Sequence, residues 1–398
     1  MQQLHGSTRA YPWGSRSLIS GLRGEPATEK PEAEIWYGAH PAAPATLGVG
    51  EKARGLDDVI ATDPVHYLGR DVAGAFHGEL PFLLKILAAD EPLSLQAHPS
   101  SAIAREGFER ENAAGIALSA PNRNYKDPNH KPELIVALTE FDAMAGFRPL
   151  EKTRELFELL NCPELDRYLT MLEENPACES ANLRALFTTW ITIPGTVRHG
   201  LIEALINAAQ PHRDRQDWMG FCLNNIIQLN ERYPGDVGVL GALLLNHVRL
   251  QPGEAVYLAA CHLHAYIRGM GVEIMANSDN VLRGGLTSKY VDVPELVKVL
   301  DFHSMAEPIV ARDGENPHQE YPVPAKEYRL FRHLLKPGEE LTIDFPGPVI
   351  ALCIRGQISV GDKEIQPTES LWISASDPAT QAKNIAADTT AELFIATT

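Results

Sequence analysis

The segment Phe82–Leu87 reads Phe-Leu-Leu-Lys-Ile-Leu, a short apolar run that carries one charge. Turn-forming residues bound it, with Gly78 and Pro81 on one side and Asp90 and Pro92 on the other. A run of this length between such residues is typical of a β-strand buried in a sheet. Similar short runs recur through residues 1–150, so we predict that this part of the chain is mainly β, with a few helices between strands.

The pattern of apolar residues changes after Pro149, where they recur at spacings of three and four. This periodicity predicts amphipathic helices whose apolar faces pack against one another, which makes residues 149–242 an inserted helical domain. The stripes are Leu156, Leu159 and Leu160; Leu201, Ile202, Leu205 and Ile206; and Trp218, Phe221, Cys222, Ile226 and Leu229.

The strand pattern returns near Leu243 and continues to the end of the chain. Short alternating runs such as Val349–Ile354 follow one another between turn residues, which is typical of a sandwich or jelly roll. We therefore expect a mainly β fold with an inserted helical domain. Residues 1–148 and 243–320 would form the principal β domain, and residues 321–398 a C-terminal β domain.

Composition narrows the classes of function. The 398 residues carry a formal net charge of −17, which argues against general nucleic-acid binding and against docking on anionic membranes. The chain has no apolar stretch long enough for a transmembrane helix and no apolar run resembling a signal peptide near Met1. Its 5 cysteines show no C-x-x-C spacing, so we expect a reducing compartment, the cytoplasm.

Polar residues follow the first strand in the segment Ser94–Pro99. In an extended chain Ser94, Gln96 and His98 point to the same side, because strand side chains alternate with period two. These three side chains would line a polar cavity. A turn that contains a hydrogen-bonded histidine would explain the same residues.

A second segment, Tyr125–Leu134, brings His130, Lys131 and Glu133 close together. Lys131 and Glu133 would share a face of an extended chain, and the alternative is an ordinary surface ion pair. The apolar run that follows places this pair towards the interior, where charges need partners or a metal.

A third segment places His262 and His264 on one face of a strand, where one of them could bind a metal. The alternative is a histidine pair on a solvated strand. Further along, Arg283 precedes two glycines, which let a ligand approach the backbone closely, and Lys289 adds a second cation. The guanidinium suits two-pronged binding of a phosphate.

The three segments together supply a candidate ligand set of two imidazoles, a carboxylate and an amide oxygen. Such a set suits zinc and would also tolerate iron, manganese or cobalt. The cations Lys85, Lys131, Arg283 and Lys289 predict an anionic substrate. The ligand set is Gln96, His98, Glu133 and His264.

With these residues the chain resembles type I mannose-6-phosphate isomerases, also called phosphomannose isomerases. The resemblance runs over nearly the whole chain. It departs from the usual family pattern at Gly284, at Ser288 and in Leu258–Cys261, which concerns substrate preference more than metal binding. The matching segments are Tyr11–Ser15, Ala33–Trp36, Leu93–Pro99, Tyr125–Glu133, Gly146–Pro149 and His264–Lys289.

The resemblance implies a cupin fold, with jelly-roll β domains and a helical domain inserted into the catalytic one. It places one zinc ion per chain on Gln96, His98, Glu133 and His264, and it leaves His262 out of the ligand set. It places Arg283 in the active site. The other residues that it places in the same pocket are Lys85, Ser94, Lys131 and Lys289.

The implied reaction interconverts mannose 6-phosphate and fructose 6-phosphate through a cis-enediol. In this scheme Lys131 would carry the proton, and His130 and Asp279 would assist ring opening. We expect a monomer whose partner is a small phosphorylated sugar. Two other functions remain open at this point: another metal-dependent cupin enzyme, such as a non-haem iron oxygenase, and a non-catalytic protein that binds sugar phosphates.

Overall fold

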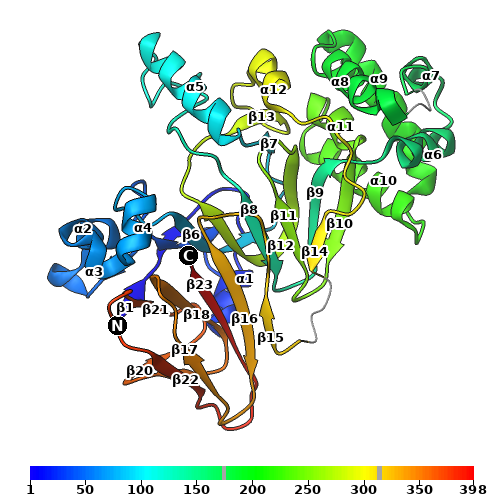
Figure 1. Cartoon of the computed structure of the whole chain (residues 1–398). Helices are drawn as coiled ribbons and strands as arrows, with labels where there is room; N and C mark the ends of the chain where they lie inside the picture. The colour runs from blue at the N-terminus through cyan, green and yellow to red at the C-terminus, as the bar shows by residue number, and fades with distance from the viewer. Residues whose placement is uncertain (173–175, 312–315) are drawn as a thin grey trace.

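The computed structural model describes residues 1–172, 176–311 and 316–398. Within them the chain forms three sheets of antiparallel strands and a group of helices (Figure 1). The C-terminal strands lie at one end of the molecule and helices α6–α11 at the other, with the largest sheet between them. The expectation of a mainly β fold with helices is confirmed.

The largest sheet is organised around β12 (His264–Ala276). The C-terminal part of β12 pairs with β6 (Phe82–Ala89) on one side and β8 (Glu133–Ala137) on the other. Its N-terminal part pairs instead with β7 (Leu95–Ala97) and β9 (Phe141–Phe147). One strand therefore joins the two parts of this sheet.

The strand expected at Phe82–Leu87 is thus confirmed as the core of β6. The remaining strands of this sheet are β2 (Ser7–Arg9), β3 (Glu34–Gly38), β10 (Leu245–Leu250), β11 (Ala255–Leu258), β13 (Leu282–Gly285) and β14 (Ile309–Ala311).

The C-terminal part is a sandwich of an eight-stranded and a four-stranded sheet. In β18 (Val349–Arg355) alternate side chains enter two different cores: Ile350 packs towards the largest sheet and Ala351 towards the four-stranded one. The eight-stranded sheet also contains β15 (His318–Glu320), β16 (Arg329–Leu335), β21 (Ser370–Ile373), β23 (Ala391–Thr397), β1 (Gln2–His5), β4 (Thr46–Leu47) and β5 (Arg54–Gly55). The four-stranded sheet contains β17 (Glu340–Ile343), β19 (Ile358–Val360), β20 (Lys363–Ile365) and β22 (Thr380–Asn384).

The first strand of the chain lies in the sheet formed by the last strands, because β1 pairs with β21 and the chain then passes through β4 and β5. The segment Gln2–His5 therefore belongs to the C-terminal sheet by its hydrogen bonds. The domain limits expected from the sequence stay a prediction. They assign the first strand to the principal β domain, whereas its hydrogen bonds join it to the C-terminal strands.

Helices fill the stretch in which the sequence predicts them, and each of the three apolar stripes lies in one of them. Among the described residues, none of the helices has both the length and the apolar character needed to cross a membrane. In this stretch they are α6 (Leu150–Leu160), α7 (Pro163–Leu169), α8 (Glu179–Ile191), α9 (Gly195–Ala209), α10 (Trp218–Arg232) and α11 (Val237–Ala242).

The other helices lie between strands. In α5 the Ser100 side chain accepts a hydrogen bond from the backbone N–H of Ile103, which is the cap that the sequence suggests. They are α1 (Leu18–Leu22), α2 (Leu56–Thr62), α3 (Pro64–Leu68), α4 (Arg70–Ala75), α5 (Ser101–Ala113) and α12 (Val293–Val299), with short 3₁₀ turns at Gly50–Lys52, Pro176–Cys178 and Gln210–His212.

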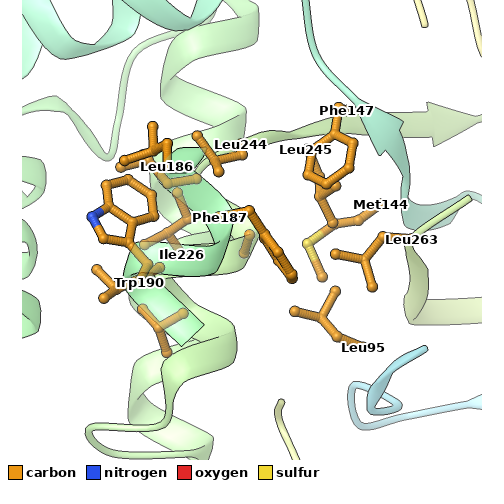
Figure 2. Packing of buried hydrophobic residues seen from close by; sticks show 14 of the residues in the cluster. Leu95, Met144, Phe147, Leu186, Phe187, Trp190, Ile226, Leu244, Leu245 and Leu263 are labelled. Atoms are coloured by element: carbon orange, nitrogen blue, oxygen red, sulfur yellow. The ribbon is translucent and has the colours of Figure 1, made fainter. Parts of the chain in front are cut away.

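A single hydrophobic cluster joins the helices to the largest sheet. Figure 2 shows Trp190 and Ile226 on the helical side of this cluster and Met144 and Leu263 on the sheet side. Phe187 of α8 is almost fully buried among them, with its ring centroid 5.7 Å from that of Phe147. The cluster includes Leu95 and Leu263, which directly precede Gln96 and His264, so the helical core supports the strands that carry these residues.

We predict that Phe187→Ala lowers the free energy of unfolding by about 3–5 kcal/mol, because it removes a buried ring and leaves a cavity. Urea unfolding followed by circular dichroism measures this loss. Val197→Ala is the matched control, since Val197 lies in α9 and is 47% exposed, and its loss should stay within about 0.5 kcal/mol. Equal effects of the two substitutions would contradict the assignment of Phe187 to the core.

Candidate active site

A cavity of about 490 Å³ opens on the face of the largest sheet that points away from the C-terminal sandwich. In β6, β8 and β12, the side chains Lys85, Glu133 and Glu273 alternate with residues that pack towards the sandwich, so all three reach the opposite face. Strand periodicity thus gathers three charged side chains in one place. The lining contains five cations, Lys85, Lys131, Arg232, Arg283 and Lys289, and four acids, Glu34, Glu133, Glu273 and Asp279.

Three potential metal ligands meet at this cavity. His98, Glu133 and His264 are all buried, and each offers a ligand atom within 4.8 Å of the others. One carboxylate oxygen of Glu133 lies 3.4 Å from Nε2 of His98, and the other lies 3.3 Å from Nε2 of His264. The three side chains come from distant parts of the chain and converge because β8 and β12 are neighbours and His98 directly follows β7.

The hydrogen bonds of the two imidazoles leave their Nε2 atoms free. Nδ1 of His98 lies 2.6 Å from the backbone oxygen of Asn280, and Nδ1 of His264 lies 2.9 Å from that of His262. A carbonyl oxygen can only accept, so each Nδ1 carries the proton and each Nε2 presents a lone pair. Both Nε2 atoms and Oε2 of Glu133 are buried without a hydrogen-bond partner in the described structure. Two lone pairs and a carboxylate turned towards one point fit a divalent metal such as zinc.

The protonation states also fit metal binding, which requires neutral imidazole and ionised carboxylate. Burial lowers the pKa of His98 to about 4, so the ring is neutral at neutral pH. Burial by itself would raise the pKa of Glu133. The ammonium of Lys131, 2.9 Å from Oε1, nevertheless holds the pKa of this carboxyl well below its ordinary value.

The register of β7 between β12 and β13 places Gln96 beside His264 and Arg283 beside Gln96. In β7, Gln96 lies opposite His264 of β12 on one side and opposite Arg283 of β13 on the other. Both Gln96 and Arg283 line the cavity. Burial lowers the pKa of Arg283, and within the described residues its guanidinium forms no ion pair with a carboxylate. Its charge is therefore available to an anionic ligand.

Lys85 is held by a network that the sequence analysis did not identify. Its Nζ lies 2.7 Å from Oε2 of Glu273 and 3.5 Å from Oε1 of Glu34. The Trp36 indole N–H donates to Glu34, and the Tyr266 hydroxyl donates to Glu273. Burial by itself would lower the pKa of Lys85, but the two carboxylates raise it above its ordinary value. Lys85 is therefore a fixed cation.

The structure places three further predicted residues in this cavity, because Ser94, Asp279 and Lys289 all line it. Oδ1 of Asp279 lies 3.6 Å from Nε2 of the buried His40. His262 is directed elsewhere, with its Nε2 3.9 Å from Oδ2 of Asp301.

His130 lies outside this cavity. It lines a separate cavity of about 350 Å³, where its Nε2 is 2.7 Å from Oε1 of Glu327. The extended chain before β8 turns Lys131 and Glu133 to one side and His130 to the other. Its position argues against the predicted part of His130 in ring opening.

The cavity also contains residues that the sequence analysis did not single out. Tyr11 and Trp13 belong to a motif that supports the family resemblance, so a signal for them was present. Arg232 and Tyr233 come from the end of α10. Nothing local in the sequence connects that helix with the strands of the cavity, and only the packed fold brings them together.

The family follows from comparison with known proteins. Residues 1–150 match the family described as phosphomannose isomerase type I, catalytic domain. The chain is 38% identical over 394 residues to mannose-6-phosphate isomerase of Escherichia coli (strain K12), covering 95% of both. The chain belongs to the type I phosphomannose isomerases. The human mannose-6-phosphate isomerase is a more distant member, 36% identical over 320 residues, with 74% of this chain and 72% of the human one covered.

Solved structures of phosphomannose isomerases have the same fold over the whole chain. A crystal structure of a mutant phosphomannose isomerase from Salmonella typhimurium superposes with a TM-score of 0.89 at 34% identity, covering 100% of this chain and 99% of that one. A mannose 6-phosphate isomerase crystallised with zinc bound gives 0.88 at 34% identity, covering 100% and 98%. The resemblance stated from the sequence is therefore confirmed.

We predict that His98→Ala and Glu133→Ala each abolish stoichiometric zinc binding, because each removes one of three ligands that converge on a single point. The measurement is zinc content by mass spectrometry after loading and exhaustive dialysis. His333→Ala is the control, since it alters a buried histidine of the C-terminal sheet and should retain full zinc content. Full zinc content in either ligand variant would refute the assigned metal site.

Proposed function

We propose that this protein interconverts D-mannose 6-phosphate and D-fructose 6-phosphate, with one zinc ion held by Gln96, His98, Glu133 and His264. One observation carries this proposal: three buried, unpartnered ligand atoms converge beside a cavity lined by five cations. Its relatives in Escherichia coli and human are named for this activity, and a structural neighbour contains zinc. These relationships support both the substrate and the metal.

Some cations of the cavity are paired with carboxylates, and others are free to bind an anionic ligand. Arg283 and Lys289 have no carboxylate contact within the described residues, and we assign them to the phosphate or to negative charge that develops on the sugar. Ser94 contributes a hydroxyl that can donate to a substrate oxygen. Lys85 is already neutralised by Glu273 and Glu34, so it orients the substrate through hydrogen bonds and contributes little net charge.

The isomerisation moves one proton from C2 of the aldose to C1 of the ketose, and the C2 hydroxyl becomes the carbonyl as the C1 carbonyl becomes a hydroxyl. Zinc, when bound, supplies Lewis-acid polarisation of the two oxygens. The proton carrier has to accept and return the proton within hydrogen-bond reach of the carbons. We assign this role to Lys131 in its neutral amine form, which accepts the proton from C2 and returns it to C1; its only carboxylate contact among the described residues is Glu133, whereas Lys85 has two.

Ring opening needs a group that takes the proton of the C1 hydroxyl and a group that protonates the ring oxygen. Asp279 lines the cavity and is 44% exposed, so its carboxylate can reach a bound sugar. We assign the first role to Asp279. His130 lies in a separate cavity and has no part in this scheme.

The same residues distinguish the proposed function from the two rival functions. A non-haem iron oxygenase could use two histidines and a carboxylate, but it has no use for five cations around its substrate. A non-catalytic binding protein could use the cations but would not need Lys131 beside the ligand cluster and the carboxylate of Asp279 in the same cavity. The monomeric state and the cytoplasmic location stay predictions.

The decisive experiment is an assay of mannose 6-phosphate isomerisation coupled to detection of fructose 6-phosphate. Activity should disappear after treatment with a chelator and return on addition of zinc, because the ligand atoms have no other partner. Iron, manganese and cobalt added to separate samples serve as controls for the metal. A zinc-loaded protein that is folded yet inactive on this substrate would overturn the proposed function.

Arg283→Ala should lower kcat by about 10²–10³-fold, the usual cost of removing a group that stabilises developing negative charge. Zinc content should stay at the wild-type level, because Arg283 is not a ligand. Arg283→Lys should recover only part of the rate, since an ammonium cannot form a two-pronged contact. Arg213→Ala, in the exposed turn before α10, is the control for loss of a positive charge. Unchanged kcat in Arg283→Ala would remove this residue from the active site.

A further inference from the structure

Two residues of the motif segments have no role in the reaction scheme, yet they hold the site's two loops together. Asp127 belongs to the loop before β8, which carries Lys131 and Glu133. Asn280 belongs to the loop after β12, which carries Asp279 and leads to Arg283. The two residues hydrogen-bond to each other, and the backbone oxygen of Asn280 also contacts His98.

The Asp127 carboxylate accepts hydrogen bonds from three residues of the second loop. Its Oδ1 accepts from the Ser278 hydroxyl at 2.8 Å, from the Asn280 side-chain amide at 3.2 Å and from the backbone N–H of Asn129 at 3.0 Å. Its Oδ2 accepts from the backbone N–H of Asp279 at 2.7 Å. This last contact fixes the backbone of Asp279, from which the side chain enters the cavity.

The side chain of Asn280 in turn connects the second loop to the backbone of the first. It is fully buried, and its amide donates to the backbone oxygens of Asp127 at 2.8 Å and Asn129 at 2.9 Å. Its Oδ1 accepts from the backbone N–H of Lys126 at 2.7 Å. Every polar atom of this side chain therefore bonds to the first loop, which leaves its backbone carbonyl in a fixed position.

That carbonyl is the one that accepts from Nδ1 of His98, at 2.6 Å. If it moved away, Nδ1 would lose its acceptor and His98 could shift its proton to Nε2. A protonated Nε2 has no lone pair for a metal. Groups that orient a metal-binding histidine typically contribute 10–100-fold to metal affinity or activity.

We propose that Asp127 and Asn280 are positioning residues that lock the two loops together, so that one hydrogen-bond network sets both the tautomer of His98 and the place of Asp279. The network thus couples the metal site to the wall of the substrate cavity. The part concerning Asp279 rests on the proposed function, whereas the part concerning His98 does not.

The first test measures zinc affinity by competition with a chromogenic chelator. Asp127→Asn replaces one of the two acceptor oxygens by an amide donor, and Asn280→Ala removes the side-chain connection to the first loop. Each should weaken zinc binding by about 10–100-fold. Asn384→Ala is the matched control: Asn384 is 1% exposed, its amide also donates to two backbone oxygens, and it lies in the C-terminal sheet. Its zinc affinity should equal that of the wild type.

The second test reads the tautomer directly, by ¹⁵N NMR of histidine-labelled, zinc-free protein with the His98 signals assigned through His98→Gln. In the wild type Nδ1 should carry the proton. In Asp127→Asn a signal of protonated Nε2 should appear. Ser278→Ala removes only one hydroxyl from the network, and it provides a milder variant with a smaller shift of the same kind if Asp127→Asn does not fold.

A third comparison separates the two halves of the coupling. Asp279→Asn should lower kcat and leave zinc affinity unchanged, whereas Asp127→Asn should lower both. Folded Asp127→Asn and Asn280→Ala proteins with wild-type zinc affinity and an unchanged His98 spectrum would overturn the proposal. Neither of those readouts uses the substrate, so they remain decisive even if the protein does not isomerise mannose 6-phosphate.

Discussion

The positions of the charged and metal-binding side chains on the strands of the cavity depend on the pairing of β12. This strand changes partners along its length, from β7 and β9 to β6 and β8, so a single backbone carries His264 at one end and Glu273 near the other. A shift of one residue in this register would turn both side chains to the opposite face. The two apolar residues on either side of Glu273, Val272 and Ile274, pack towards the C-terminal sandwich and hold the register.

This constraint also explains how a chain with a net charge of −17 can offer a site to an anion. The sheet brings acids and bases together in pairs rather than as separate patches: Lys85 with Glu273, and Lys131 with Glu133. Buried charged side chains are stable only when they pair with an opposite charge in this way. The pairs neutralise one another, and the site's usable positive charge comes from Arg283 and Lys289, which have no carboxylate contact in the described part of the chain.

Local patterns were sufficient for the parts of this structure that depend on local geometry. Period-two alternation put Gln96 with His98 on one face and Lys131 with Glu133 on one face, and three-and-four spacing found α6, α9 and α10. Contacts between distant strands leave no such trace. The pairing of β1 with β21, and the meeting of Lys85 with Glu34 and Glu273, depend on which strands become neighbours. His130 shows the reverse: its closeness to Lys131 in sequence suggested a shared cavity, while the extended backbone sends the two apart.

The departures from the usual family pattern after Arg283 also differ in where they lie, in the packed core or at the cavity. Gly285 has a φ of +131°, and a Cβ there would lie 2.5 Å from the backbone nitrogen of Gly238, so only glycine fits this close approach to α11. Gly284, where the family usually has alanine, is different: a Cβ would lie 3.2 Å from Leu263, inside the core that joins helices and sheet. It does not line the cavity. Ser288 does, so of these two positions only Ser288 presents its side chain directly to the cavity, whereas Gly284 acts through the packing beneath His264.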